Sequence, residues 1–196
     1  MRCAKVRIRT TTMKSNPFPI PLSPFLPSML FVVNLFLFSF LPAADWASWR
    51  GNPQQTGMAQ GKISDNLKRL WSFRTGKKIV STPVVGNGVV YFGSGDRNIW
   101  AVSLESGKAL WSYATSNAVD APGLLHGDTL YIGSSDGSFF ALDAKKGTLR
   151  WKVLLDGQIM GAPGLLGRGD KSLILLGAYD NAMHAYLVAR APVTVT

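Results

Sequence analysis

The sequence predicts an all-β protein: a partial β-propeller of about three blades in an open arc, following an N-terminal signal segment. Three tryptophans, Trp71, Trp111 and Trp151, recur at one constant interval along the chain. Within each interval, short β-branched and aromatic runs alternate with Gly, Asn and Asp turn residues. No stretch after residue 45 keeps a helical period long enough to predict a helix. Four short strands in each interval are typical of a propeller blade.

The repeats place the individual elements. Residues 91–111 read YFGSGDRNIWAVSLESGKALW and residues 131–151 read YIGSSDGSFFALDAKKGTLRW. Segments around Pro83, Pro122 and Pro163 also match one another. These matches predict blades at about 79–114 and 119–154 and an incomplete blade at 159–188. The sequence LWSFR at 70–74 matches the fourth strand of a blade, so we expect an outer strand over 70–75.

Residues 1–44 differ in composition from the rest. They hold five basic residues, no acid and six of the 11 prolines, but none of the 20 glycines. Their apolar run, MLFVVNLFLFSFL at 29–41, is too short to span a membrane and suits the core of a signal peptide. An uncleaved N-terminal anchor is the alternative, and Met13 is an alternative start to Met1. We therefore expect an exported protein, periplasmic or extracellular, that contacts membrane only if this segment is retained.

The remainder divides into three parts. Residues 45–69 are expected to be an opening segment or linker, 70–190 the repeats and 191–196 a tail. The single cysteine, Cys3, lies in the signal segment. The exported part would therefore have no disulfide, cysteine-ligated metal or thiol nucleophile.

The recurring residues resemble the tryptophan-docking motif of the pyrroloquinoline-quinone-type (PQQ-like) propeller repeat family. Residues 101–111 read AVSLESGKALW and residues 141–151 read ALDAKKGTLRW, although the family favours Asp and Thr where these copies have Ser103 and Lys146. The segment WASWRGNP at 46–53 resembles the opening of many exported members. The resemblance implies that each tryptophan packs on the neighbouring blade, with small residues giving it room. The docking residues expected in this chain are Trp71, Ala101, Gly107, Trp111, Ala141, Gly147 and Trp151.

Three carboxylates, Asp96, Asp136 and Asp180, occupy the same phase of each repeat. Because Asp stabilises turns by bonding the backbone two residues on, we expect turn residues rather than catalytic acids or calcium ligands. His126 is expected in a solvated loop, and His184 aligns with Trp100 and Phe140 at an aromatic position. No second histidine or carboxylate lies near either histidine at ligand spacing. Asp120, taken as replacing Ser81 of the first copy, is a candidate for a surface between blades.

These observations predict no catalytic, cofactor-binding or metal-binding residues. The leading hypothesis is a non-catalytic scaffold for protein contact or assembly in the cell envelope, similar to propellers associated with outer-membrane protein assembly. A truncated or degenerate copy is the second hypothesis. A quinoprotein dehydrogenase, which would need PQQ and calcium, is the third. Nucleic acid is not an expected partner. The orphan outer strand and the incomplete blade predict protein partners or self-association through open propeller edges.

Overall fold

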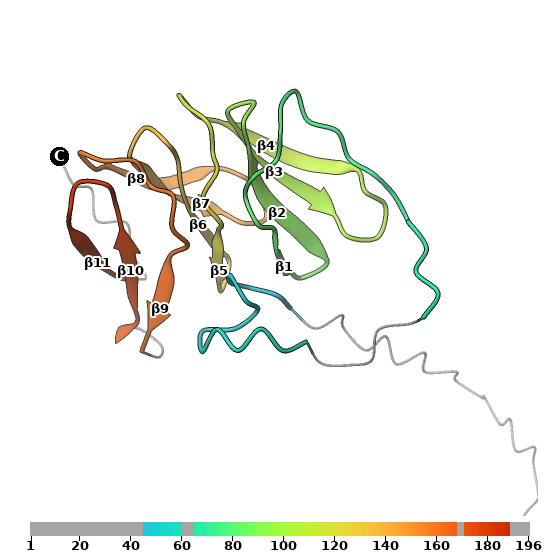
Figure 1. Ribbon diagram of the computed structural model, residues 1–196, viewed down its shortest axis with the longest axis horizontal. Helices are drawn as coiled ribbons and strands as arrows, with labels where there is room; N and C mark the ends of the chain where they lie inside the picture. Colours follow the sequence, from blue (N-terminus) through green and yellow to red (C-terminus); the bar gives the residue numbers. More distant parts are fainter. Residues whose placement is uncertain (1–44, 60–64, 168–170, 189–196) are drawn as a thin grey trace, which may run out of the picture. The chain divides into compact units, whose positions relative to one another are not determined.

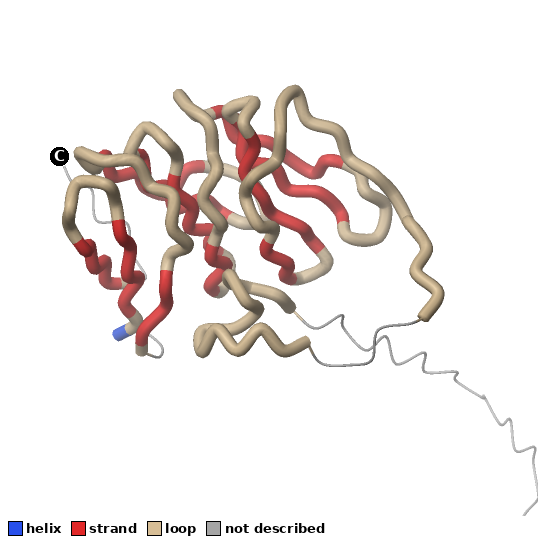
Figure 2. Tube along the Cα trace, viewed as in Figure 1, coloured by secondary structure: helices blue, strands red, loops and turns tan. Residues whose placement is uncertain are grey.

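Short runs of β-branched, aromatic and leucine residues form the strands of the described part of the chain. The computed structural model describes residues 45–59, 65–167 and 171–188, so the predicted signal segment 1–44 and the tail 191–196 lie outside the described residues. The described part consists of strands, turns and loops, with a single 3₁₀ position at Lys171 (Figure 2). Its strands are β1 (Val84–Gly86), β2 (Val89–Ser94), β3 (Asn98–Ser103), β4 (Ala109–Ala114), β5 (Leu124–His126), β6 (Thr129–Gly133), β7 (Ser138–Asp143), β8 (Leu149–Leu154), β9 (Gly164–Leu166), β10 (Leu173–Gly177) and β11 (Met183–Leu187).

These strands form three antiparallel sheets, each in simple meander order (Figure 1). The first two sheets, β1–β4 and β5–β8, have four strands, and β9–β11 has three. Two-residue turns such as Asn87-Gly88, with φ of 53° and 73°, join the first strands of a sheet. The protein is therefore an all-β, partial β-propeller with open sheets, as the repeat predicts.

The register repeats from sheet to sheet. Tyr91 pairs with Ala101 and Ala101 with Trp111, while Tyr131 pairs with Ala141 and Ala141 with Trp151. A register shift follows Ala101 and again follows Ala141. Residues that recur in the sequence therefore occupy equivalent positions in successive blades.

One alignment made from the sequence is wrong. The first strands β1, β5 and β9 recur at the same constant interval as the tryptophans, which makes Gly123 the equivalent of Pro83 and Pro163. Pro122 lies one position earlier than the other prolines. Asp120 is therefore the equivalent of Val80, and Ser81 is the equivalent of Ala121. Matching by proline alone shifted this segment by one residue.

The hydrophobic cores lie between successive sheets. The first core joins Val84, Tyr91, Ile99 and Ala101 of the first sheet to Leu125, Leu130, Ile132, Phe140 and Leu142 of the second. Trp111 and Tyr113 pack against this core. The second core repeats the arrangement between the second and third sheets, with Phe139 and Ala141 against Ile174 and Leu176. The second sheet thus has two apolar faces, because it contacts a neighbour on both sides.

Replacing Trp111 by alanine should lower the free energy of unfolding by about 3 kcal/mol, near the low end for a tryptophan truncation because the ring is only partly buried. Denaturant unfolding followed by circular dichroism measures this loss. Trp49→Ala is the matched control, since Trp49 is 41% exposed, and it should cost under ~1 kcal/mol. Equal losses for the two variants would contradict the packing role of Trp111.

Candidate interaction surface

Trp71 and Trp111 each bond to the blade that follows them in the sequence. Trp111, on the outer strand β4, donates from Nε1 to the carbonyl oxygen of Ala144 in the second blade, at 2.9 Å. Trp71 makes the equivalent bond to the carbonyl of Leu104, at 2.8 Å. Both bonds span 33 residues of sequence. The indole is an apolar plate with one donor, and this geometry satisfies both properties at once.

Glycine is required where each ring lies. Gly107 and Gly147 have φ of 67° and 71°, a region that favours glycine. A Cβ atom on Gly107 would lie 2.6 Å from the Trp71 ring, and one on Gly147 would lie 2.6 Å from the Trp111 ring. Both glycines therefore serve a turn and a close contact.

The predicted alanines lie opposite the tryptophans. Ala101 and Ala141 are fully buried and face Trp111 and Trp151 in the register. Trp151 packs against Tyr131, Phe139 and Tyr186, with ring centroids 5.6–5.9 Å apart. The structure thus brings the predicted docking residues together in pairs, each at a contact within or between blades.

The expected outer strand at 70–75 is wrong as a strand assignment. These residues form no strand, because a strand in a sheet needs a hydrogen-bonded partner and the described residues provide none. The side chains nevertheless alternate as in β4: Trp71, Phe73 and Thr75 are partly buried, and Ser72 and Arg74 are exposed. The segment therefore has the side-chain pattern of a fourth strand without its sheet.

Segment 70–78 repeats the contacts that β4 and its following turn make. Phe73 packs edge-on against Trp100 at 5.1 Å, as Tyr113 does against Phe140 at 5.6 Å. The backbone bond from Gly95 N–H to the Lys78 carbonyl recurs at the equivalent positions of the next repeat, from Ser135 to Ala118. The first blade thus carries the docked outer segment that a preceding blade would supply.

The three repeated carboxylates close their turns. Asp96, Asp136 and Asp180 each accept a hydrogen bond from the backbone N–H two residues on, at 3.1, 2.9 and 3.0 Å. Asp96 also accepts a bond from Gly76 N–H at 3.0 Å, which ties segment 70–78 to the first blade. Desolvation raises the pKa of Asp96, but its hydrogen bonds, led by that from Gly76, outweigh this and hold the pKa below its usual value.

The structure corrects one expectation for each histidine. His184 does occupy the aromatic position, since it pairs with Leu176 as Phe140 pairs with Ile132. Contrary to the sequence-based expectation, a carboxylate lies beside it: His184 Nε2 is 2.8 Å from Asp180 Oδ2. The insertion before β10 lengthens the third repeat, but it leaves the spacing from Asp180 to His184 equal to that between the carboxylate and the aromatic position in the other two repeats. His126 ends β5 and is partly buried rather than fully solvated.

Asp120 remains a candidate for a polar surface. It is partly buried, and its Oδ1 is buried without a hydrogen-bond partner among the described residues. One position on, the carbonyl of Ala121 accepts a 2.8 Å hydrogen bond from Ser81 Oγ, across equivalent positions of adjacent blades.

An ionic cluster on the second blade was not predicted from the sequence. Arg150 on β8 donates to Asp128, Asp143 and the hydroxyl of Thr129 at 2.7–2.9 Å. The bond from Arg150 is the largest influence on both carboxylates, and it lowers the pKa of Asp128 and of Asp143. The equivalent positions in the first blade are Gly88, Ser103 and Leu110, so a search for repeats does not find this cluster.

The opening segment pairs with the first strand of the first blade. Trp46 forms an antiparallel bridge with Val85, with two backbone bonds of 2.8 Å. Ala47 accepts a bond from Leu125 N–H at 2.7 Å, so the segment also contacts the second blade. The expectation of a linker over 45–69 therefore understates residues 45–47, whose short pairing has no period that a sequence search could detect.

Gly147→Ala should lower the free energy of unfolding by about 2–4 kcal/mol, combining backbone strain with the clash against the Trp111 ring. Gly127→Ala is the matched control, because Gly127 also has a positive φ of 59° but nothing lies within 4 Å of its missing Cβ. It should cost only about 1 kcal/mol. Chemical denaturation measures both, and equal losses would remove the close-contact role of Gly147.

Comparisons with known proteins agree with this architecture. A family profile described as outer membrane protein assembly factor BamB matches residues 64–158 and 116–186, more than half of the 196-residue chain. Comparison with curated proteins found no sequence match. Among the described residues, no helix is both long and apolar enough to cross a membrane.

Solved structures share the fold at low identity. BamB from Moraxella catarrhalis is 23% identical with a TM-score of 0.51, over 63% of this chain and 38% of that one. Quinohemoprotein alcohol dehydrogenase from Comamonas testosteroni is 21% identical with a TM-score of 0.61, over 76% of this chain and 26% of that one. A europium-containing methanol dehydrogenase is 20% identical with a TM-score of 0.59, over 74% of this chain and 30% of that one.

The chain thus spans well under half the length of each of these structures, and the likeness establishes fold alone. Three findings support the same family: the indoles dock at a fixed interval, the blades share one register, and the profile matches most of the repeats. The chain belongs to the PQQ-like propeller repeat family whose profile is described as outer membrane protein assembly factor BamB.

Proposed function

We propose that this chain is a non-catalytic propeller module that acts through protein contacts as an assembly scaffold in the cell envelope. One observation carries the proposal: the repeated carboxylates and the Arg150 cluster bond within the blades and stabilise the fold. The repeated carboxylates cap turns, and Arg150 links Asp128 to Asp143 within one blade. The match to a profile named for an assembly factor supports the same proposal.

Export and an envelope location form part of the proposal. They rest on the basic and apolar character of residues 1–44 and on the name of the matching profile. Surfaces suited to contact are exposed on the blades: Leu110 on β4 and Leu149 on β8 are large apolar side chains that are 55% and 44% exposed.

The resemblance to quinoprotein dehydrogenases makes PQQ and calcium the alternative. Within 45–59, 65–167 and 171–188, no three His, Cys, Asp or Glu side chains lie close enough together to hold a metal ion. Asp96, Asp136 and Asp180, the acids best placed by the repeat, are already bonded within their own turns. The described residues therefore do not fit a calcium–quinone site.

Titration of the purified full chain with PQQ and calcium should leave the absorption spectrum of the quinone unchanged, because no acidic cluster in the described part of the chain is available to hold the ion. An apo quinoprotein dehydrogenase treated in parallel is the positive control. A saturable spectral shift, together with quinone reduction on addition of an alcohol, would overturn the non-catalytic proposal.

A second arm tests contact directly. A photo-reactive amino acid at Leu110 or Leu149 should give discrete cross-linked envelope proteins in cells, whereas the same residue at the buried Leu130 should give none. Cell fractionation of the same samples reports location. Recovery of the chain in the cytoplasm without adducts would contradict the scaffold proposal.

A further inference from the structure

Among the described residues, two apolar sheet faces lack the neighbouring sheet that the other apolar faces pack against. On the third sheet, Leu166, Leu173, Leu175, Met183 and Leu187 share the side facing away from the second core; we call this the trailing face. On the first sheet, Val85, Val90, Phe92, Trp100 and Val102 form the leading face, which within the described residues is packed mainly by Trp71 and Phe73.

The repeat shows what normally covers each face. In the second sheet, the positions equivalent to the leading face hold Leu125, Leu130, Ile132, Phe140 and Leu142, the second-sheet half of the first core. The trailing face corresponds to the other half: Met183 occupies the register position of Ile99 and Phe139. Ile99 and Phe139 are 0% exposed, whereas Met183 is 72% exposed. On the leading face, Trp71 and Phe73 already pack against Val90, Phe92 and Val102, which are 8%, 7% and 0% exposed. The two faces are thus complementary halves of one repeated core, and the trailing face is the exposed half.

The backbone is complementary in the same way. In the first two sheets, β3 and β7 each pair with a fourth strand that carries the docking tryptophan. On the third sheet, the equivalent strand β11 pairs with β10 and with no other strand among the described residues. Segment 70–75 has the sequence and the docking contacts of a fourth strand but no ladder.

We propose that segment 70–75 of one copy pairs antiparallel with β11 of a second copy, so that the leading face of the first copy covers the trailing face of the second. The register follows from the repeat: Ala185 pairs with Leu175 as Ala101 pairs with Tyr91, which places Trp71 opposite Ala185 and Arg74 opposite Ala182. The inference rests on the proposed function as a contact module and names the partner as this chain itself.

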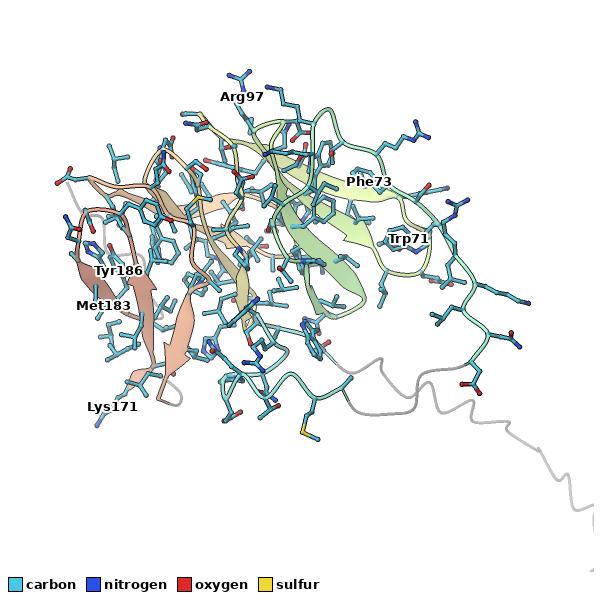
Figure 3. All side chains as sticks on the ribbon, in the orientation of Figure 1. Trp71, Phe73, Arg97, Lys171, Met183 and Tyr186 are labelled. Carbon is cyan, nitrogen blue, oxygen red and sulfur yellow. The ribbon has the colours of Figure 1, made fainter. Side chains whose placement is uncertain are left out.

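A second copy is favoured over closure within one chain. Trp71 and Phe73 lie at the opposite end of the row of sheets from Met183 and Tyr186 (Figure 3). The described residues form three blades, fewer than the roughly four to eight with which propellers close, and two copies would supply six. The contact continues an interface already present, because Trp71 is docked on the first blade before any strand pairs with it.

Cysteine cross-linking tests the register. The full chain carrying Cys3→Ser, Arg74→Cys and Ala182→Cys places two exposed thiols opposite each other across the proposed interface. A short bis-maleimide should convert most of the protein to a covalent dimer at low micromolar concentration. The matched control carries Cys3→Ser, Ala114→Cys and Ala182→Cys; Ala114 is the exposed equivalent of Arg74 within β4, so this variant should remain free of covalent dimer.

Equal cross-linking of both variants would overturn the register, and a cross-link within one chain would show closure without a partner. Light scattering on the uncross-linked protein supplies the second readout. A stable monomer over the micromolar range would overturn the proposal, and a dimer would support it. Larger open-ended species would contradict a closed pair.

Met183→Asp adds a face-specific variant. It should weaken dimerisation by at least ~10-fold, since a carboxylate would be buried in an apolar contact. Leu154→Asp, at a side chain 67% exposed on β8, should leave dimerisation unchanged. Near-ultraviolet circular dichroism checks that both variants fold. A dimer unaffected by Met183→Asp would place the contact elsewhere.

The outcomes separate this inference from the proposed function. If the protein is a monomer, leaves the PQQ spectrum unchanged and cross-links to envelope proteins, only the proposed contact between two copies is refuted. A dimer that binds PQQ and calcium would refute only the non-catalytic function.

Discussion

The fold depends on one contact: an indole ring lying over a glycine of the next blade, with its N–H bonded to a backbone carbonyl there. This contact occurs at Trp71 with Gly107 and at Trp111 with Gly147. Tryptophan and glycine recur at the same interval because the ring can lie this close to the backbone only where the facing residue has no Cβ. Buried alanines lie opposite the rings in the register, Ala101 opposite Trp111 and Ala141 opposite Trp151.

Most of the architecture could be predicted from the sequence because the strand, turn and docking residues recur at equivalent positions in successive repeats. The three sheets, their strand order and the aromatic position of His184 all follow from one aligned pattern. The match between prolines misplaced one segment, because Pro122 lies one position earlier than its counterparts Pro83 and Pro163. Segment 70–75 matches a fourth strand in sequence, but strand formation depends on a partner that a local pattern does not include.

The features that the sequence did not predict are exceptions to the repeat. Arg150 bridges two carboxylates on one blade only, and residues 46–47 bond to β1 and β5 without any periodic signal. Contacts between residues distant in sequence and present once leave no internal pattern. Among the described residues, the edge of β11 opposite β10 has no paired strand, and segment 70–75 is docked on the first blade without a ladder.

A double-mutant cycle between Trp111→Ala and Gly147→Ala tests the central contact most directly. If Gly147 exists to accommodate the ring, the penalty for Gly147→Ala should fall to that of backbone strain once the ring is removed. The account predicts a coupling of at least ~1 kcal/mol between the two sites, as expected for residues in contact. Additive penalties would show that the ring and the glycine act independently, and would contradict the account.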